Sequence, residues 1–169
     1  MVSIFRVLCL GFNYQLFEWG GGKVILETTK FGEVEIDEDE IIEFLVGPYG
    51  FEELTEYTLL VEEDSPFFWL QAINDLDLAF LVSEPWSFYE GYEFDVDDRI
   101  KEKLKLTSRE QVFVVNMITV PNDKPQEMTM NLKAPIIVNK EERLAKQIIL
   151  EEGDYPVKYS LIDGKEALA

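Results

Sequence analysis

Three aspartates, Asp64, Asp75 and Asp77, are the side chains of this sequence whose type and spacing suit acid–base chemistry. Two carboxylates that converge in a cleft, one of them with a raised pKa, can hydrolyse a glycosidic bond. Asp75 and Asp77 belong, however, to the stretch Asn74-Asp75-Leu76-Asp77, whose composition is typical of a tight turn. Turn formation explains these aspartates with fewer assumptions, and a carboxylate-dependent hydrolase is kept as an alternative.

The sequence contains few residues that could support other kinds of catalysis or metal binding. The sequence contains no histidine, which removes the usual general base and the commonest metal ligand. Cys9 is the only cysteine, so an internal disulfide is excluded and zinc or iron–sulfur sites are disfavoured. The acidic run Asp37–Glu40 lacks the glycine and final glutamate of a calcium loop. We therefore expect no catalytic residue, no metal and no cofactor.

The charge of the chain restricts its partners. Over 169 residues, 15 lysines and arginines face 34 aspartates and glutamates, which gives a formal net charge of −19. Such a field disfavours direct contact with nucleic acid or anionic lipid and favours basic proteins, although acidity also serves solubility. No apolar run approaches the roughly 20 residues of a membrane helix. A single thiol fits a reducing cytoplasm, and one acidic domain is compatible with a monomer.

The elements that must position these residues centre on two apolar runs, 67–73 and 78–82. Each run is short and rich in residues that favour strands, and the turn at 74–77 separates them. The pattern predicts two antiparallel strands joined by that turn. Three consecutive aromatic residues, Phe67, Phe68 and Trp69, must alternate between the two faces of the first strand. At least one large ring therefore leaves the main core and needs a second layer or a partner.

The rest of the chain predicts further short strands and one helix. Val96, Ile100 and Leu104 share one helical face, and Asp95 is the expected N-cap of a helix over about 95–106. No strand–helix–strand alternation is present, so we predict a mainly β fold, a small antiparallel β-barrel of bent sheets with one short α-helix. The further strands are expected at 24–29, 33–36, 41–46, 57–61, 111–120, 128–134, 136–139 and 144–150.

The two ends of the chain differ in composition from the middle. The stretch Trp19-Gly20-Gly21-Gly22-Lys23 resembles a translated ribosome-binding site, with Val24 at the position of an alternative start codon. Residues 1–23 are accordingly predicted to be a non-native or disordered leader. Residues 24–156 are expected to form the single domain, and 157–169 a frayed tail.

Several motifs along this domain resemble the FliW family of flagellar assembly factors. They run in order from about Thr28 to Pro156, and one departure is Leu45–Tyr49, where a proline-glycine-leucine-proline order is expected. The matching segments are T-T-K-F-G-E-V-E-I (28–36), G-F-E-E-L (50–54), D-S-P-F-F-W-L-Q-A (64–72), D-L-A-F-L-V (77–82), V-V-N-M-I-T-V-P (114–121), M-T-M-N-L-K-A-P-I-I-V-N (128–139) and K-Q-I-I-L-E-E-G-D-Y-P (146–156).

The resemblance implies a non-enzymatic cytoplasmic regulator. Proteins similar to FliW bind flagellin before export. When flagellin is scarce they bind CsrA, a small RNA-binding translational repressor, without occupying its RNA site, and they relieve repression of flagellin synthesis. The partners implied for this chain are therefore flagellin and CsrA, with no direct nucleic acid and no membrane.

Candidate partner-binding residues are large aromatic side chains and polar residues beside strands with a wet face. For the aromatics of 67–69, core packing is the competing explanation. The aromatic loop 86–94 is either a satellite apolar cluster or a partner-facing patch, and it also fits a peptide- or oligosaccharide-binding barrel. The segment 131–135 is suited to pairing with a peptide at the edge of a sheet; the alternative is that it is ordinary solvent-exposed surface. The candidates are Phe51, Phe67, Phe68, Trp69, Gln71, Trp86, Tyr92, Asn131, Lys133 and Pro135.

Overall fold

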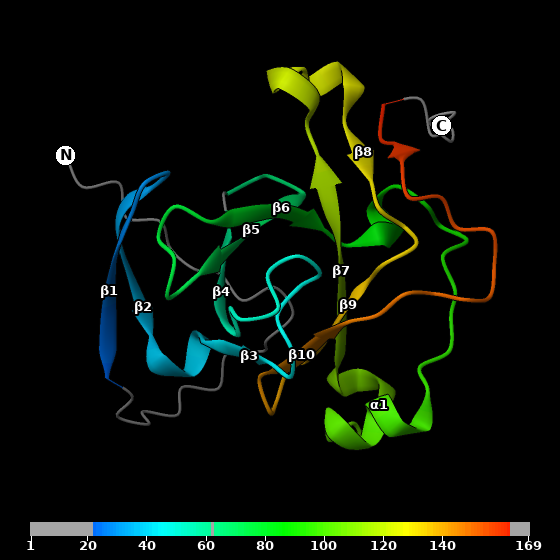
Figure 1. The fold of residues 1–169 in the computed structure, drawn as a ribbon, viewed down its shortest axis with the longest axis horizontal. Helices are drawn as coiled ribbons and strands as arrows, with labels where there is room; N and C mark the ends of the chain where they lie inside the picture. Colours follow the sequence, from blue (N-terminus) through cyan, green and yellow to red (C-terminus); the bar gives the residue numbers. More distant parts are fainter. Residues whose placement is uncertain (1–21, 62, 163–169) are drawn as a thin grey trace.

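The computed structural model describes residues 22–61 and 63–162 as a strand-rich molecule (Figure 1). The predicted leader, except for its last two residues, lies outside the described residues. Lys23 is already the first residue of β1 (Lys23–Thr28), one residue before the expected start of the domain. Five short 3-10 helices connect strands: η1 (Glu38–Glu40), η2 (Pro85–Ser87), η3 (Arg109–Gln111), η4 (Pro121–Asp123) and η5 (Pro125–Glu127).

The predicted central hairpin is present. It consists of β5 (Phe67–Ala72) and β6 (Ala79–Ser83), which pair antiparallel with Phe68 opposite Val82 and Leu70 opposite Phe80. The turn predicted at 74–77 joins them. On its other side, β5 pairs antiparallel with β4 (Glu56–Val61). The hairpin therefore forms the middle of the sheet, as its continuous apolar runs indicated.

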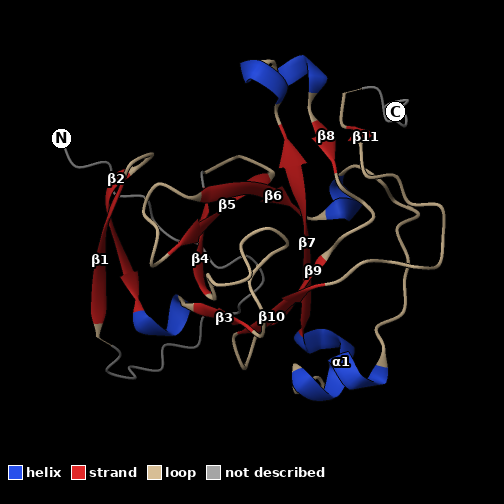
Figure 2. Cartoon of the chain, viewed as in Figure 1, coloured by secondary structure: helices blue, strands red, loops and turns tan. Residues whose placement is uncertain are grey.

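The sheet closes into a barrel of seven strands within the described residues (Figure 2). From β6 it continues to β7 (Val112–Thr119), β9 (Ile136–Asn139), β10 (Leu144–Gln147) and β3 (Ile42–Phe44), which returns to β4. The prediction of a small β-barrel is confirmed. One pair departs from the antiparallel expectation, because β3 and β10 run parallel over only two residue pairs. The interior contains Phe44, Tyr57, Phe68, Leu70, Val82, Val115 and Ile136.

Two additional layers cover the outside of this barrel. On one side, β1 and β2 (Gly32–Asp37) form a hairpin whose inward residues Leu26, Val34 and Ile36 pack with Leu60. On the other side, residues 86–106 cross the sheet and bury a second apolar cluster. Both layers are visible in Figure 1, the hairpin in blue and the crossing segment in green. These two layers therefore cover the aromatic rings on the outer face of β5, as the alternation of side chains along this strand predicted.

One α-helix is present in the described part of the chain, as predicted, but its predicted bounds are wrong. The helix α1 spans Asp98–Lys103, and its N-cap is Asp97, which accepts a hydrogen bond from the N–H of Arg99, rather than Asp95. Residues 92–97 form no regular secondary structure instead. The helix ends at Leu104, and Lys105 follows with φ of 54°. Val96 and Leu104 still pack together in the outer apolar cluster, as the prediction of a shared apolar face required. Val96 does so from before the helix, and Leu104 from the position of its C-cap.

Two strand predictions need correction near the C-terminus, and part of the predicted tail is ordered. The strand expected at 128–134 is only β8 (Thr129–Met130), because the side chain of Asn131 accepts the N–H groups of Lys133 and Ala134 and turns the chain. The strand expected at 144–150 is regular only to Gln147. Within the tail predicted to fray, β11 (Tyr159–Ser160) pairs with β8, and Tyr159 is buried. Residues 163–169 lie outside the description.

Candidate protein-binding surface

The aromatic residues of the central hairpin hold the layers together. Phe68 lies in the barrel interior, while Phe67 and Trp69 point to the outer face. Phe67 stacks on Phe88 with ring centroids 5.8 Å apart, and Trp69 meets Phe31 edge-on at 5.7 Å. These rings are covered by other parts of the same chain. The structure therefore places these three candidates in packing roles and not on an open surface.

Gln71 and the aspartates of the hairpin stabilise its turn. The Gln71 amide is fully buried, and its Nε2 donates to the carbonyl of Leu78 at 3.0 Å. The Asp75 carboxylate accepts the N–H of Asp77, and the Asp77 carboxylate accepts the hydroxyl of Thr29. Both aspartates are exposed and used in turn contacts. This geometry gives the hydrolase alternative no support from the aspartates that suggested it.

Two other carboxyl groups have a raised pKa, but they do not form a pair. Burial raises the pKa of Glu40, whose carboxylate accepts the N–H of Asp37 at the start of η1. Burial also raises the pKa of Glu84, which precedes η2 and lies in the field of Lys140. Paired-acid chemistry needs two such groups facing one cleft. Within residues 22–61 and 63–162, no group of three histidine, cysteine, aspartate or glutamate residues is placed to hold a metal.

The aromatic loop 86–94 is anchored on the sheet through Tyr92. The Tyr92 hydroxyl is buried and donates to the carbonyl of Leu132 at 2.7 Å, and burial raises its pKa far above the usual range for tyrosine. Tyr155 packs edge-on against the Tyr92 ring at 4.7 Å. Trp86 remains 42% exposed while its indole N–H donates to the carbonyl of Tyr92 at 2.8 Å. Of these two candidates, only Trp86 offers a ring to a partner.

The segment 131–135 is tied into the barrel. The carbonyl of Asn131 accepts from the buried Asn116 amide at 2.7 Å. The carbonyls of Lys133 and Pro135 accept the N–H groups of Leu150 and Ile148 at 2.9 and 3.0 Å. These carbonyls are already bonded, so this segment does not offer the edge that the sequence suggested. The free edge belongs to the neighbouring residues 147–151.

Two adjoining grooves lie on either side of residues 93–96, and these residues line both of them. The smaller groove, of about 420 Å³, contains Trp86 together with Lys101 and Arg109. The larger groove, of about 830 Å³, lies between residues 91–97, α1 and residues 148–155, and its charged lining is entirely acidic. The pKa of Lys101 is raised by its hydrogen bond to Asp98 and by the charge of that carboxylate, and the charge of Asp95 raises it further. The larger groove thus presents an anionic, partly apolar surface.

A second surface feature lies next to the larger groove, and the sequence analysis identified only one of its residues, Phe51, as a candidate. Val46, Tyr49 and Phe51 are 48, 54 and 39% exposed, so one short loop carries three exposed large apolar residues. The N–H of Tyr49 donates to the side chain of Gln147, which places this loop beside the strand end that carries Ile149. We call residues 46–51 the exposed apolar loop. Its apolar content was visible in the sequence, but its exposure depends on where β3 ends.

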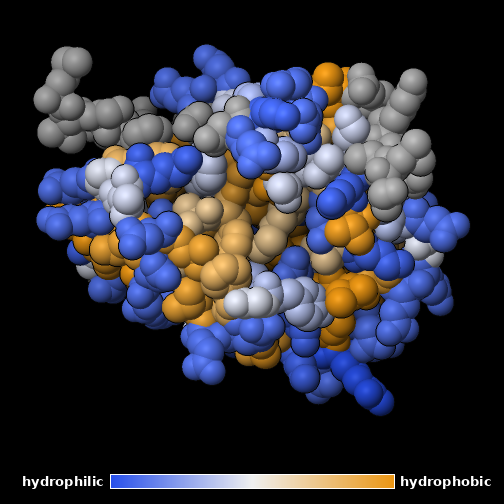
Figure 3. Space-filling model, turned by 45° about the horizontal axis from the view of Figure 1, so that its top comes forward, coloured by the Kyte–Doolittle hydropathy of each residue, from blue (hydrophilic) through white to orange (hydrophobic). Residues whose placement is uncertain are grey.

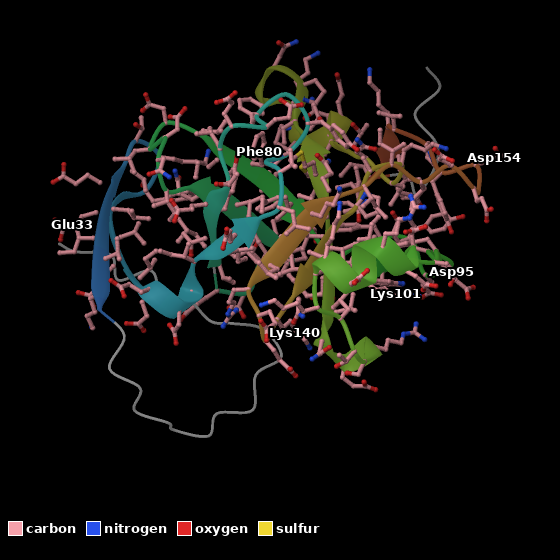
Figure 4. The ribbon with its side chains drawn as sticks, turned by 60° about the horizontal axis from the view of Figure 1, so that its bottom comes forward. Glu33, Phe80, Asp95, Lys101, Lys140 and Asp154 are labelled. Atoms are coloured by element: carbon pink, nitrogen blue, oxygen red, sulfur yellow. The ribbon has the colours of Figure 1, made fainter. Side chains whose placement is uncertain are left out.

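Figure 3 shows apolar side chains gathered around a hollow on one face of the molecule, with hydrophilic side chains surrounding them. Phe51, a candidate from the sequence, packs on Phe80 of β6 at 5.1 Å, and Figure 4 shows Phe80 at the barrel wall. A closed barrel whose surface carries exposed aromatic rings beside an acidic groove has the features of a protein-binding surface.

Comparison with known proteins identifies the kind of module. The sequence profile described as "FliW protein" matches residues 25–161. The chain is 45% identical over 143 residues to the flagellar assembly factor FliW of Bacillus velezensis, covering 83% of this chain and 98% of that protein. The corresponding protein of Caldicellulosiruptor saccharolyticus is 39% identical over 141 residues, covering 83% and 92%.

Solved structures agree with the sequence comparisons. A crystal structure of the flagellar assembly factor FliW superimposes with a TM-score of 0.73 and 38% identity, covering 83% of this chain and 96% of that one. The chain belongs to the FliW family of flagellar assembly factors. Within the described residues, no helix is both long enough and apolar enough to cross a membrane.

Proposed function

We propose that the protein acts in the cytoplasm as a monomeric assembly factor that binds flagellin before export. When flagellin is scarce it binds the translational repressor CsrA from outside the RNA site and thereby relieves repression of flagellin synthesis. Membership of the FliW family carries this proposal. The exposed aromatic rings and the acidic groove support a role in binding proteins, and the scattered positions of the carboxyl groups with raised pKa support a role without catalysis.

The net charge of −19 supplies a physical route from binding to RNA release. An RNA-binding protein is cationic at its RNA site, and a strongly anionic protein docked nearby repels incoming phosphates. At physiological salt this repulsion acts over a Debye length of about 8 Å. A partner bound beside the RNA site therefore lowers RNA affinity without touching the site. A surface variant with fewer carboxylates that still binds CsrA is expected to release less RNA.

The experiment that tests the function is affinity capture from the native cytoplasm before and after flagellin depletion. The tagged full chain is expected to retain flagellin in the first condition and CsrA in the second, because the two partners alternate with flagellin supply. Purified flagellin and CsrA are then titrated separately against the purified chain. A protein that retained neither partner in either condition, and bound neither in titration, would refute the proposal.

A further inference from the structure

The end of β10 and the segment that follows it have backbone groups on one side that bond to no described residue. β3 pairs with β10 at only two positions, and its last bond is the N–H of Leu45 to the carbonyl of Ala145 at 2.9 Å. β3 then departs, because the N–H of Gly47 bonds to Glu52 within its own loop. A Cβ on Gly47 would lie 2.1 Å from the carbonyl oxygen of Phe51, so this turn is closely packed. Residues 147–151 therefore lose their neighbour on this side, and we call them the open edge.

The hydrogen bonds on the opposite side show which groups are free. The N–H groups of Ile148 and Leu150 bond to the carbonyls of Pro135 and Lys133. Successive N–H groups of an extended strand point to opposite sides, so those of Ile149 and Glu151 point away from this partner. Neither bonds to another described residue. A row of unpaired backbone groups of this kind is a template for an added strand.

The surroundings of the open edge combine apolar and acidic side chains. Ile149 is 54% exposed, beside the exposed apolar loop. The larger groove runs along the same residues, and its lining includes Phe94, Val96 and Ile100. Its charged side chains are five carboxylates that form no ion pair with the described residues, namely Glu93, Asp95, Asp97, Glu151 and Glu152.

We propose that the open edge accepts an extended, cationic segment of a partner protein as an added strand. Backbone groups of Ile149 and Glu151 pair with the segment, Ile149 and the exposed apolar loop contact its apolar side chains, and the groove carboxylates bind its lysines or arginines. A segment of about five residues, roughly 17 Å long, matches the length of the edge. The five unpaired carboxylates select against a second copy of this chain, which is itself strongly anionic.

The cationic occupant can be assigned to one of the two proposed partners. This assignment rests on the function proposed above. RNA-binding proteins are rich in lysine and arginine, so a cationic segment of the repressor that lies outside its RNA site is the occupant whose chemistry fits an acidic groove. Flagellin excludes CsrA in the proposed function, but its own binding is expected not to depend on the groove carboxylates or on the free N–H groups of the open edge. The assignment makes the two interactions separable by mutation at the open edge.

The direct test uses a blocked six-residue peptide of alternating lysine and valine, titrated into the ¹⁵N-labelled full chain. The amide signals of Ile149 and Glu151 are expected to shift and to become protected from exchange. The same peptide N-methylated at every residue cannot donate to the edge, and a glutamate–valine peptide has the wrong charge; both are expected to leave these signals unchanged. Equal binding of the N-methylated peptide, or shifts confined to other residues, would overturn the strand-addition proposal.

Paired variants separate the edge from its charges in the intact complex. Ile149→Pro removes one free N–H and keeps both bonds of the opposite side, whereas Ile149→Ala keeps the N–H. Loss of one interfacial hydrogen bond is expected to weaken CsrA binding about two- to tenfold in the proline variant relative to the alanine variant. Thermal melting of both variants verifies that the fold is retained. Affinity equal in the two folded variants would contradict pairing at Ile149.

The charge requirement has a matched control on the opposite end of the molecule, where Figure 4 shows Glu33 far from Asp95. The variant Glu151→Gln/Glu152→Gln and the control Glu27→Gln/Glu33→Gln change the net charge equally. Only the first is expected to weaken CsrA binding, by roughly three- to tenfold. Unchanged CsrA binding, or loss of flagellin binding instead, refutes the assignment of this edge. If the wild-type chain binds neither protein, the proposed function itself fails.

Discussion

Removal of the Tyr92 hydroxyl tests how the aromatic loop is fixed to the barrel. The variant Tyr92→Phe keeps the ring contacts with Trp86, Phe94 and Tyr155, whose centroids lie 6.0, 5.4 and 4.7 Å away. It removes the 2.7 Å hydrogen bond that the hydroxyl donates to the carbonyl of Leu132, a fully buried residue, and the 3.3 Å bond that it accepts from the Asn116 amide. A buried carbonyl without its donor costs about 1–3 kcal/mol. For a chain of this length, a loss of about 2 kcal/mol corresponds to a melting temperature lower by roughly 4–8 °C.

The assay is urea unfolding with calorimetric melting, and the matched control is Tyr49→Phe. The Tyr49 side chain is 54% exposed and its hydroxyl makes no hydrogen bond within the described residues, so the same chemical change there is expected to cost less than about 0.5 kcal/mol. Because the loop continues into the wall of the larger groove, we also expect faster amide exchange in residues 93–96 of the Tyr92 variant. Equal stability of the two variants would show that the Leu132 bond does not hold this loop.

Three further predictions concern the hairpin and its covering layer. Gln71→Leu removes the two 3.0 Å bonds from Nε2 to the carbonyls of Ala72 and Leu78 and is expected to lower the unfolding free energy by about 1–3 kcal/mol. A cost below about 0.5 kcal/mol in urea unfolding counts against a role of Gln71 in fixing the turn. Lys30→Ala removes a cation 4.0 Å from the Trp69 ring centroid and is expected to cost about 0.5–1 kcal/mol, a loss that Trp69→Leu should abolish in a double-mutant cycle. Burial, with the charge of Asp75 adding to it, raises the pKa of Tyr57 to about 12. The unfolded chain therefore releases this proton near its ordinary pKa of about 10 while the folded chain retains it, so stability is expected to fall by up to about 1.4 kcal/mol per pH unit from pH 10 to 12. Tyr57→Phe removes this contribution, and identical alkaline unfolding of variant and wild type contradicts it.

Local patterns predicted the centre of the fold because its contacts are close in sequence. The apolar runs of the 67–82 hairpin specify two strands, and the polar residues between them specify the turn, which the buried Gln71 amide then fixes. The three consecutive aromatics correctly implied an outer layer, since the pleat leaves them no other arrangement. The order of the motifs also identified the family, which no single motif did.

Long-range pairing decided the parts that the sequence did not predict. The alternation at 128–134 suggested a strand, but a side-chain bond of Asn131 turns the chain there. Candidate aromatics such as Phe68 were buried because the barrel closes around them. The open edge exists only because β3, distant in sequence, leaves β10 after two residue pairs. Exposure of Ile149 therefore depends on topology, and an apolar residue in a predicted strand gives no signal of it.

The central claim, that this chain controls a repressor by binding proteins, is tested most directly by fluorescence anisotropy of a labelled flagellin-transcript RNA bound to purified CsrA. Addition of the full chain is expected to lower the anisotropy as RNA is released, and subsequent addition of excess flagellin is expected to restore it as the chain is drawn away from CsrA. Anisotropy that stays constant at saturating concentrations of the chain, or that falls and is unaffected by flagellin, would contradict the account.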